Sequence, residues 1–518
     1  AGDALLRSSP RSAALRYRQA IAYLPASGDS ALHVRLARAL RRAGQPDEVA
    51  RVCRNGLGDA TGAERDALTR YLSSALADLG DLGGALAMVD QEVAANGPSV
   101  VLLSTRALLH RLLDDVAAAG RDVDAAEALV ATERDRLAVL FQRLNLGVDI
   151  GAPGGGAAAL AELEHMLPTL DPETRLMAHA HAAGACVGLG EVSRGARHLT
   201  AADELAAGGV VDVDWPWTFG ARVAVEVATG RWDDAVRSYE LGAGEVSSGL
   251  RQLVRNQLVT SISDVALARG DVGQLRRYTT QVALLTPQSR RILAMARAKV
   301  HRAEGRFADA VVELDGALDG VPPCSNIEMY VLLALVATHT KLGHHDVNRT
   351  LLVRFREAAA VAATPWSDVL LRLLELRVAD DVDAGQEGLR LARQHGNLRY
   401  EPEFRLHLGA RGVDPSANLL AAYHQFGELG AVTDVAAVEA ELRRVGVRVP
   451  NRRRVGRFAL TDAEQRVAGL VAEGLSNRAI GEQLAYSTKT IETYLSRIYA
   501  KTGCRNRVEL ARHVRAAG

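Results

Sequence analysis

The sequence predicts an all-α protein in which a long array of helix pairs precedes a small four-helix domain. Apolar residues recur along the chain at the spacing of amphipathic helices. They make up 48% of the 518 residues whereas aromatic residues make up only 4%, so Ala, Leu and Val must provide most of the buried surface. Glycine-centred turns return at a regular interval, which is typical of helical repeats.

Residues 1–445 are predicted to form the repeat array. Its unit is an amphipathic helix, a glycine-centred turn, and a second helix that opens with small and acidic residues. The clearest turn glycines are Gly44, Gly80, Gly190, Gly230, Gly270, Gly305 and Gly343. Adjacent ones lie 36, 40, 40, 35 and 38 residues apart where the run is unbroken, near the tetratricopeptide period of about 34. The segments 147–156 and 379–385 fit least well.

The physical reason for such an array is that one helix pair cannot bury its own apolar stripe. Neighbouring pairs must therefore stack, and a stack of similar pairs curves into a superhelix. We expect residues 1–445 to form a tetratricopeptide-like helical repeat superhelix that acts as a sensor or interaction domain. Residues 446–456 combine glycines, Pro450 and an arginine cluster without a helical period, so they are predicted to be a linker.

Residues 457–518 are predicted to form four short helices with start and stop signals at their ends. The first opens with a capping box of Thr461 and Glu464 and closes at Gly474. Ser476 caps a second helix over 477–485, and Ser487 caps a third over 488–502. A fourth opens at Asn506 and ends near Val514. The very short turn between the second and third helices is typical of a helix-turn-helix.

The third of these helices has two different faces. Ile491, Leu495 and Ile498 recur at helical spacing and are expected to pack inward. The opposite face is polar and of mixed charge, and it is suited to meet base edges in a DNA major groove. Its members are Lys489, Glu492, Thr493, Ser496 and Arg497. The alternative is a helical bundle with a solvated face, which requires neither so many caps nor the short turn.

This segment resembles the DNA-binding domain of LuxR-type transcriptional regulators. The matching stretches are Leu460-Thr461 with Glu464, Gly474 to Ile480, Ser487 to Ile491, and Lys501-Thr502-Gly503 with Arg507. With the polar face, the resemblance implies base readout by Glu492, Thr493, Ser496 and Arg497. It implies phosphate contacts by Ser476, Asn477, Lys489, Thr490, Lys501 and Arg507. It also implies a homodimer on double-stranded DNA, joined through the fourth helix around Val508 and Arg512.

Two positions depart from the common pattern of that family. Glu492 stands where many members have lysine, and Tyr494 replaces a frequent histidine. A carboxylate accepts a hydrogen bond from cytosine N4 and repels phosphate, so a different operator is expected. Tyr494 is expected to donate to a phosphate or to pack against the second helix.

The charge distribution agrees with this assignment. From Arg452 to the end there are 13 basic and 6 acidic residues, while the preceding 451 residues hold 49 basic and 56 acidic ones. The net charge of zero therefore hides a basic end on an acidic body, as expected of a local phosphate-binding surface. Whether the arginines of the linker touch phosphates or form a solvated tether stays open.

The chain as a whole resembles the large ATP-binding branch of LuxR-type regulators, which includes the bacterial maltose regulator. Its opening, from Ala4 to Pro25, is similar to the first arm that follows the winged helix in that branch. The ATPase domain of that branch is absent from this sequence, and the sequence does not tell whether it was removed or never present. We therefore expect no cofactor in this chain, and ATP only where an upstream ATPase domain exists.

No catalytic constellation is recognisable, so an enzyme is not expected. Lysine occurs at only four positions, none after a glycine, which rules out a phosphate-binding loop of the G-x-x-x-x-G-K type. His179 and His181 at i and i+2 point to different helix faces, so no metal site is expected. The four scattered cysteines indicate reduced thiols, and no apolar run is long enough for a membrane helix. A cytoplasmic location is expected.

The predicted function is sequence-specific DNA binding that regulates transcription, controlled by a small-molecule or protein effector on the repeat array. The alternative is a repeat scaffold that mainly binds a protein partner, with DNA binding secondary. Nothing in the sequence identifies the effector, the operator, or whether transcription is activated or repressed.

Overall fold

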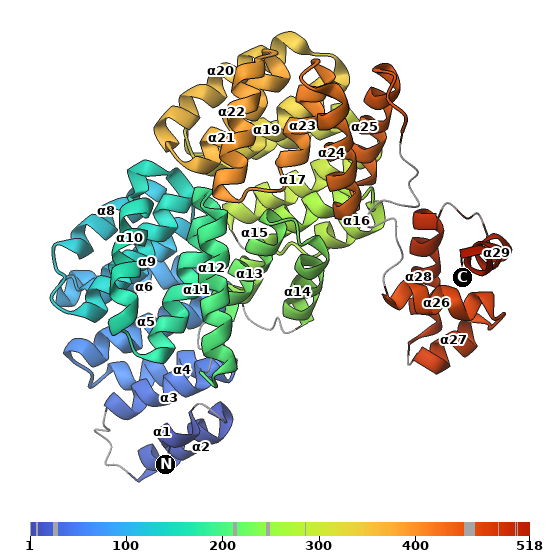
Figure 1. Cartoon of the computed structure of the whole chain (residues 1–518). Coiled ribbons are helices and arrows are strands. Elements are labelled where there is room, and N and C mark those ends of the chain that lie inside the picture. The colour runs from blue at the N-terminus through green and yellow to red at the C-terminus, as the bar shows by residue number, and fades with distance from the viewer. Residues whose placement is uncertain are drawn as a thin grey trace. The chain divides into compact units, whose positions relative to one another are not determined.

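The structure is a computed structural model that describes residues 2–6, 9–23, 30–210, 215–244, 249–284, 286–449, 462–484, 486–502, 504 and 506–517. Within these ranges all regular secondary structure is helical and no strand occurs, which confirms the predicted all-α class (Figure 1). The chain divides into two compact units. The first comprises Ala1–Leu267 and Asp271–Arg399, and the second comprises Ala268–Gly270 and Tyr400–Gly518.

The helices of the first unit follow one another with short connections. They are α1 (Gly2–Leu5), α2 (Pro10–Ala22), α3 (Ser30–Arg42), α4 (Pro46–Leu57), α5 (Gly62–Asp78), α6 (Leu82–Asn96), α7 (Val100–Leu112), α8 (Val116–Glu127), α9 (Glu133–Ile150), the 3₁₀ turn η1 (Ala152–Gly154), α10 (Gly156–Met166), η2 (Leu167–Thr169), α11 (Pro172–Leu189), α12 (Val192–Ala207), α13 (Trp215–Ala228), α14 (Trp232–Gly244), α15 (Gly249–Ala268), α16 (Val272–Thr280), α17 (Pro287–Ala303), α18 (Phe307–Leu318), α19 (Asn326–Leu342), α20 (His345–Ala362), α21 (Pro365–Val378) and α22 (Val382–His395).

Consecutive helices pack as pairs, as predicted for a tetratricopeptide-like array. α3 contacts α4, α7 contacts α8, α11 contacts α12, and α17 contacts α18. At one such pair, the buried Trp232 of α14 donates its indole N–H to the Val227 carbonyl of α13 at 3.1 Å. The aromatic residue at the start of this second helix therefore packs against the helix before it.

Two copies of the repeat are not recognisable from the glycine pattern of the sequence, because an aspartate replaces the turn glycine in each. Asp114, between α7 and α8, has φ 77°, and Asp380, between α21 and α22, has φ 55°. Aspartate tolerates this left-handed conformation better than most side chains. With these two and Gly151, the positive-φ residues that stand in the turn inside each helix pair, from Gly44 to Asp380, recur every 34 to 40 residues. The poorly fitting segments 147–156 and 379–385 are thus turns of the same array.

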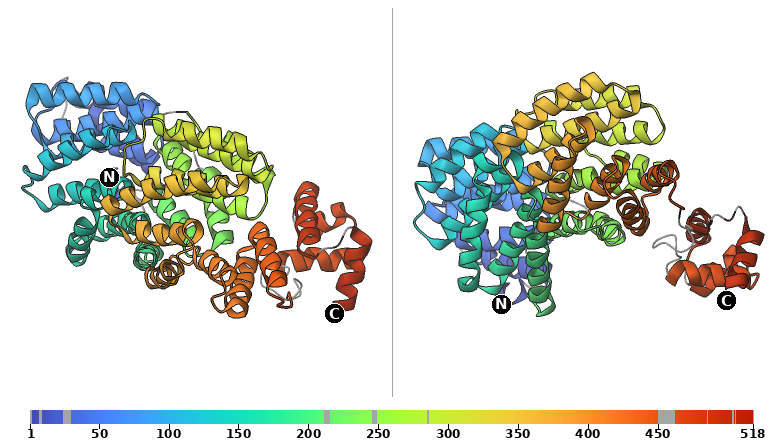
Figure 2. Two further views of the ribbon diagram at one scale, coloured as in Figure 1. Left: turned by 90° about the horizontal axis from the view of Figure 1, so that it is seen from above. Right: turned by 45° about the horizontal axis from the view of Figure 1, so that its top comes forward.

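Within the first unit, early and late repeats contact each other. α9 contacts α19, α11 contacts α21, and α12 contacts α22; Figure 2 shows these groups of helices side by side. Asn397 donates its side-chain N–H to the Gly190 carbonyl at 3.1 Å across 207 residues. Asp114 forms an ion pair with the buried Arg291, 177 residues further along the chain. The array therefore returns on itself, and we call this set of contacts the seam.

The second unit holds the end of the repeat and the four C-terminal helices. Its helices are α23 (Glu401–Ala410), α24 (Pro415–Leu429), α25 (Val432–Arg444), α26 (Asp462–Ala472), α27 (Asn477–Leu484), α28 (Thr488–Thr502) and α29 (Arg507–Ala517). The domain boundaries proposed from the sequence, at 445 and 457, stay a prediction, and residues 450–456 of the proposed linker lie outside the described residues.

Candidate nucleic-acid interface

The four C-terminal helices share one small apolar core. α26 contributes Val467 and Val471, α27 contributes Ile480, and α29 contributes Leu510, each at most 1% exposed. From α28, the side chains of Ile491, Leu495 and Ile498 complete the core, with exposed fractions of 0%, 5% and 0%. The prediction that these three residues pack inward is confirmed. Their burial fixes the rotation of α28 about its axis.

That rotation leaves the predicted polar face of α28 in solvent. Its five side chains are all exposed, and they stand at i, i+3, i+4, i+7 and i+8 along one side of the helix: Lys489, Glu492, Thr493, Ser496 and Arg497. The Thr493 hydroxyl donates to the Lys489 carbonyl, and the Ser496 hydroxyl donates to the Glu492 carbonyl, both at 3.0 Å. In this state the two hydroxyl oxygens face outward mainly as acceptors.

Side-chain caps hold the starts of α27 and α28 in place. The Ser476 hydroxyl accepts the Ala479 N–H at 3.2 Å, and the Ser487 hydroxyl accepts the Thr490 N–H at 3.0 Å. The Thr490 side chain lies 2.7 Å from the Ser487 hydroxyl. At the start of α29, the Asn506 side chain accepts the Glu509 N–H at 2.9 Å. Three of the caps predicted from the sequence are confirmed, whereas Thr461 of the first lies outside the described residues.

Arg507 connects the start of α29 to the start of α27. Its guanidinium donates to the Asn477 side-chain carbonyl at 2.9 Å and to the Leu475 backbone carbonyl. Both Arg507 and Asn477 are half-buried. These two predicted phosphate contacts are therefore brought together, and their hydrogen bonds also position two helix ends. The helix of Lys501 is described, but its side chain lies outside the described residues.

The sequence of these helices matches a known family of DNA-binding domains. Residues 459–514 match the family described as "Bacterial regulatory proteins, luxR family". This match covers α26, α27, α28 and most of α29, with the short turn between α27 and α28 and the exposed face of α28.

Residues 459–514 form a LuxR-type helix-turn-helix domain.

Two transcriptional regulators are similar to this chain over part of its length. A protein of Mycobacterium bovis named "Putative HTH-type transcriptional regulator Mb0914c" is 32% identical over 142 residues, which is 26% of this chain and 16% of that protein. The "DNA-binding transcriptional activator DevR/DosR" of Mycobacterium tuberculosis is 40% identical over 52 residues, covering 10% of this chain and 24% of that one. This chain thus spans less than a quarter of either relative. The 142 matched residues extend beyond the LuxR-type domain.

Among solved structures, a chain of the APC/C hetero-tetramer Cut9–Hcn1 is similar with a TM-score of 0.41. The sequence identity is 11%, and the superposition covers 99% of this chain and 94% of that chain.

The turn of the LuxR-type domain contains residues that the sequence did not single out. The Tyr486 N–H donates to the Gly481 carbonyl at 2.8 Å. The Tyr486 ring lies 5.6 Å from the Tyr494 ring of α28. Burial, then hydrogen bonding with Tyr486, raises the pKa of Tyr494. Tyr494 therefore packs against the turn, and the glycine inside α27 was the signal in the sequence that the turn passes close by.

Outside the LuxR-type domain, the histidines considered as metal ligands do not converge. His179 Nδ1 lies 3.0 Å from His198 Nδ1, whereas His181 stacks on Phe141 with ring centroids 4.3 Å apart. Burial, followed by the nearby charge of His198, lowers the pKa of His179 to about 4. Among the described residues, no group of three or more His, Cys, Asp or Glu side chains is suited to hold a metal ion. None of the helices in the described ranges combines the length and apolar character needed to cross a membrane.

Proposed function

We propose that this chain is a sequence-specific DNA-binding transcriptional regulator whose LuxR-type domain places α28 in the major groove. The observation that carries the proposal is the exposed polar face of α28 above the buried Ile491, Leu495 and Ile498. The match of residues 459–514 to the LuxR family and the names of the relatives support it. As proposed, DNA binding uses no cofactor in this chain.

The side chains on the face of α28 have complementary roles in this proposal. Glu492 accepts from cytosine N4, and Arg497 donates to guanine acceptors or to a phosphate. Thr493 and Ser496 accept from base edges, or donate once their hydroxyls turn away from the helix carbonyls. Because these groups differ in charge and in donor character, the face discriminates between base pairs.

Phosphate contacts position the domain on DNA in the same proposal. Lys489 and Lys501 supply charge, and the capped starts of α27 and α28 supply Ser476, Thr490 and backbone N–H groups. Asn477 and Arg507 complete the set and hold the helix starts in register. From Arg452 onward the chain has 13 basic and 6 acidic residues, and this positive balance supports a phosphate-binding role.

The repeat array receives the signal in this proposal, and the LuxR-type domain gives the output. Helical repeats offer extended surfaces for an effector or a protein partner. A homodimer on a two-fold DNA site is also proposed, joined through α29, where the apolar side chain of Val508 is 61% exposed.

The test is selection of DNA sequences by the full chain, followed by binding measurements on the selected site. Glu492→Ala is expected to relax preference at one base pair by about 1–3 kcal/mol, because a carboxylate acceptor is lost. Glu473→Ala is the matched control, since Glu473 is exposed in the turn after α26 and carries the same charge. The control should keep the preference of the parent.

Two outcomes would contradict the proposal. The full chain would select no sequence above background, or Glu492→Ala and Glu473→Ala would leave the same base preferences as the parent.

A further inference from the structure

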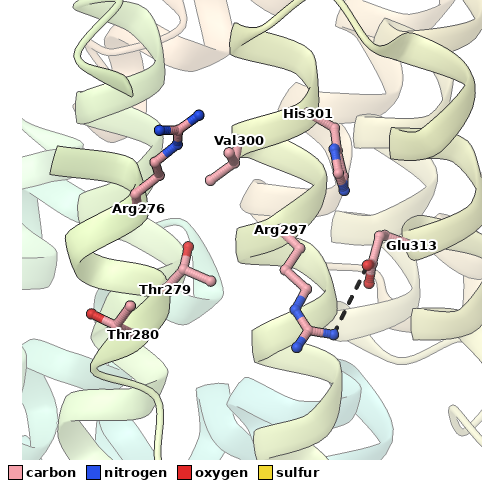
Figure 3. Close-up of a pocket in the computed structure, with 7 residues that line it drawn as sticks. All are labelled: Arg276, Thr279, Thr280, Arg297, Val300, His301 and Glu313. Carbon is pink, nitrogen blue, oxygen red and sulfur yellow. Dashed lines mark ion pairs between the residues drawn. The ribbon is translucent and has the colours of Figure 1, made fainter. Parts of the chain in front are cut away.

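The first unit contains a hollow of about 470 Å³ between three consecutive helices. Figure 3 shows Arg276 and Thr279 on α16, Arg297 and His301 on α17, and Glu313 on α18. The hollow has the size of a small-molecule site. Its walls are the helix faces that carry Arg276 and Thr279 at i and i+3, and Arg297, Val300 and His301 at i, i+3 and i+4.

The arginines of this hollow differ in how far they are already paired. Arg276 forms an ion pair with Glu304, a carboxylate that also pairs with Arg306. Arg297 is 4.0 Å from Glu313, too far for a hydrogen bond. Across the described residues, no hydrogen bond of the Arg297 guanidinium is present, and its side chain is 54% exposed. A guanidinium has five N–H donors in a fixed fork, which matches a carboxylate or a phosphate.

Besides Arg297, whose only ion pair among the described residues is the long one with Glu313, the hollow contains a histidine nitrogen without a hydrogen-bond partner. His301 Nδ1 is buried and has no hydrogen-bond partner within the described part of the chain. A buried polar atom without a partner costs free energy, and a ligand atom would remove this cost once the imidazole ring turns so that Nδ1 faces the hollow. Val300, 8% exposed, provides an apolar surface between Arg297 and His301.

The remaining groups accept hydrogen bonds. The Thr279 hydroxyl donates to the Leu275 carbonyl at 2.8 Å, so its oxygen faces a ligand as an acceptor. Glu313 is a carboxylate that is 26% exposed. A ligand that satisfies the whole set therefore has an oxyanion for Arg297 and hydroxyl or amino groups for the acceptors.

We propose that the hollow between α16, α17 and α18 binds a small organic oxyanion, a carboxylate or a phosphate ester, that also carries hydroxyl or amino groups. Arg297 and His301 bind the oxyanion, and Thr279 and Glu313 accept from the donors of the ligand. That such a ligand acts as the effector of the LuxR-type domain rests on the proposed function. Binding of the ligand to the hollow is independent of the proposed function.

The experiment is calorimetric titration of the full chain, without DNA and in phosphate-free buffer. One arm uses citrate, a hydroxylated carboxylate, and the other uses glucose 6-phosphate, a hydroxylated phosphate ester. The variants are Arg297→Gln, Glu313→Gln and, as a control with the same loss of charge, Arg349→Gln. Arg349 lies on α20, is 67% exposed and pairs with Asp346.

At least one of the two compounds, citrate or glucose 6-phosphate, is expected to bind the parent chain. Arg297→Gln should weaken that binding about tenfold or more, because a charge-assisted pair is lost. Glu313→Gln should tighten it severalfold, since the amide still accepts a hydrogen bond but no longer repels the anion. Arg349→Gln should match the parent.

The proposal is overturned if neither probe binds at millimolar concentration. It is also overturned if Arg349→Gln loses as much affinity as Arg297→Gln, or if Glu313→Gln binds more weakly than the parent. Because DNA is absent, failure here leaves the proposed DNA binding untouched.

Discussion

Among single residues, Gly481 shows how closely the turn of the LuxR-type domain approaches α27. A Cβ atom at this position would lie 2.6 Å from the Tyr486 carbonyl oxygen, well inside contact distance. The neighbouring atom is backbone, so it cannot rotate away as a side chain would. A glycine is therefore required here for steric reasons, and its own helical conformation is ordinary.

Gly481→Ala is expected to destabilise the LuxR-type domain by about 1–3 kcal/mol, because the turn must move away from α27. The measurement is hydrogen exchange of the amides of α26 to α29 in the full chain. The control is Gly469→Ala in α26, where an added Cβ would meet nothing within 4 Å. That substitution should stabilise its helix by about 0.5–1 kcal/mol. Equal effects of the two substitutions would contradict the steric argument.

At the level of helices, a buried charge network joins α15, α17 and α19. Lys299 of α17 is 4% exposed and lies 2.7 Å from the Asp264 carboxylate of α15. Tyr330 of α19 donates to the same carboxylate, and Arg399 lies 3.3 Å from it. Burial raises the pKa of Asp264, but the charges of Lys299 and Arg399 and the hydrogen bonds outweigh burial and lower this pKa to about 2.

The network predicts an acid dependence of stability in the first unit. The pKa of Asp264 is lower in the folded state than the value of about 3.9 expected in the unfolded chain. Its stabilising contribution is therefore complete above about pH 4 and is lost as the pH falls towards 2, by about 2–3 kcal/mol.

Hydrogen exchange of α15, α17 and α19 between pH 5 and pH 2 measures this loss. The Asp264→Asn variant should show a smaller decrease over that range, since its amide does not titrate. Parallel pH profiles for the two proteins would exclude Asp264 as the group responsible.

For the molecule as a whole, the seam couples repeats that are far apart in the sequence. Gly190, at the turn between α11 and α12, has φ +92°, and a Cβ there would lie 2.2 Å from the Trp366 backbone nitrogen of α21. The turn glycine at Gly343 has φ +73°, but nothing lies within 4 Å of its added Cβ. An alanine would adopt a strained backbone at both positions. Only at Gly190 would its Cβ also meet another repeat across the seam.

Alanine at either position should cost about 1–2 kcal/mol for the left-handed backbone. Gly190→Ala is expected to cost about 1–3 kcal/mol more than Gly343→Ala, because it also pushes the seam apart. Hydrogen exchange should show the additional loss of protection in both α11–α12 and α21–α22. If protection falls only near the substituted turn in both variants, the seam does not couple these repeats.

Much of the LuxR-type domain could be predicted because its signals are local. The third helix was placed at 488–502 and α28 spans Thr488–Thr502, since a serine cap and a 3.6-residue apolar period both act within a few residues. The exposed face with Glu492 and Arg497 followed from the same period. The approach of Tyr486 to Gly481 could not be predicted, because it depends on how two helices pack.

The repeat array shows the same division between local and distant causes. Apolar stripes occur in each repeat and turn glycines in most of them, so the all-α class and the stacking of helix pairs follow from the amino-acid sequence. The left-handed Asp114, its pairing with Arg291 and the network around Lys299 do not, because each partner lies tens to hundreds of residues away. Such contacts arise only when the repeats stack and the array returns on itself. The conformational preferences of neighbouring residues therefore do not predict them.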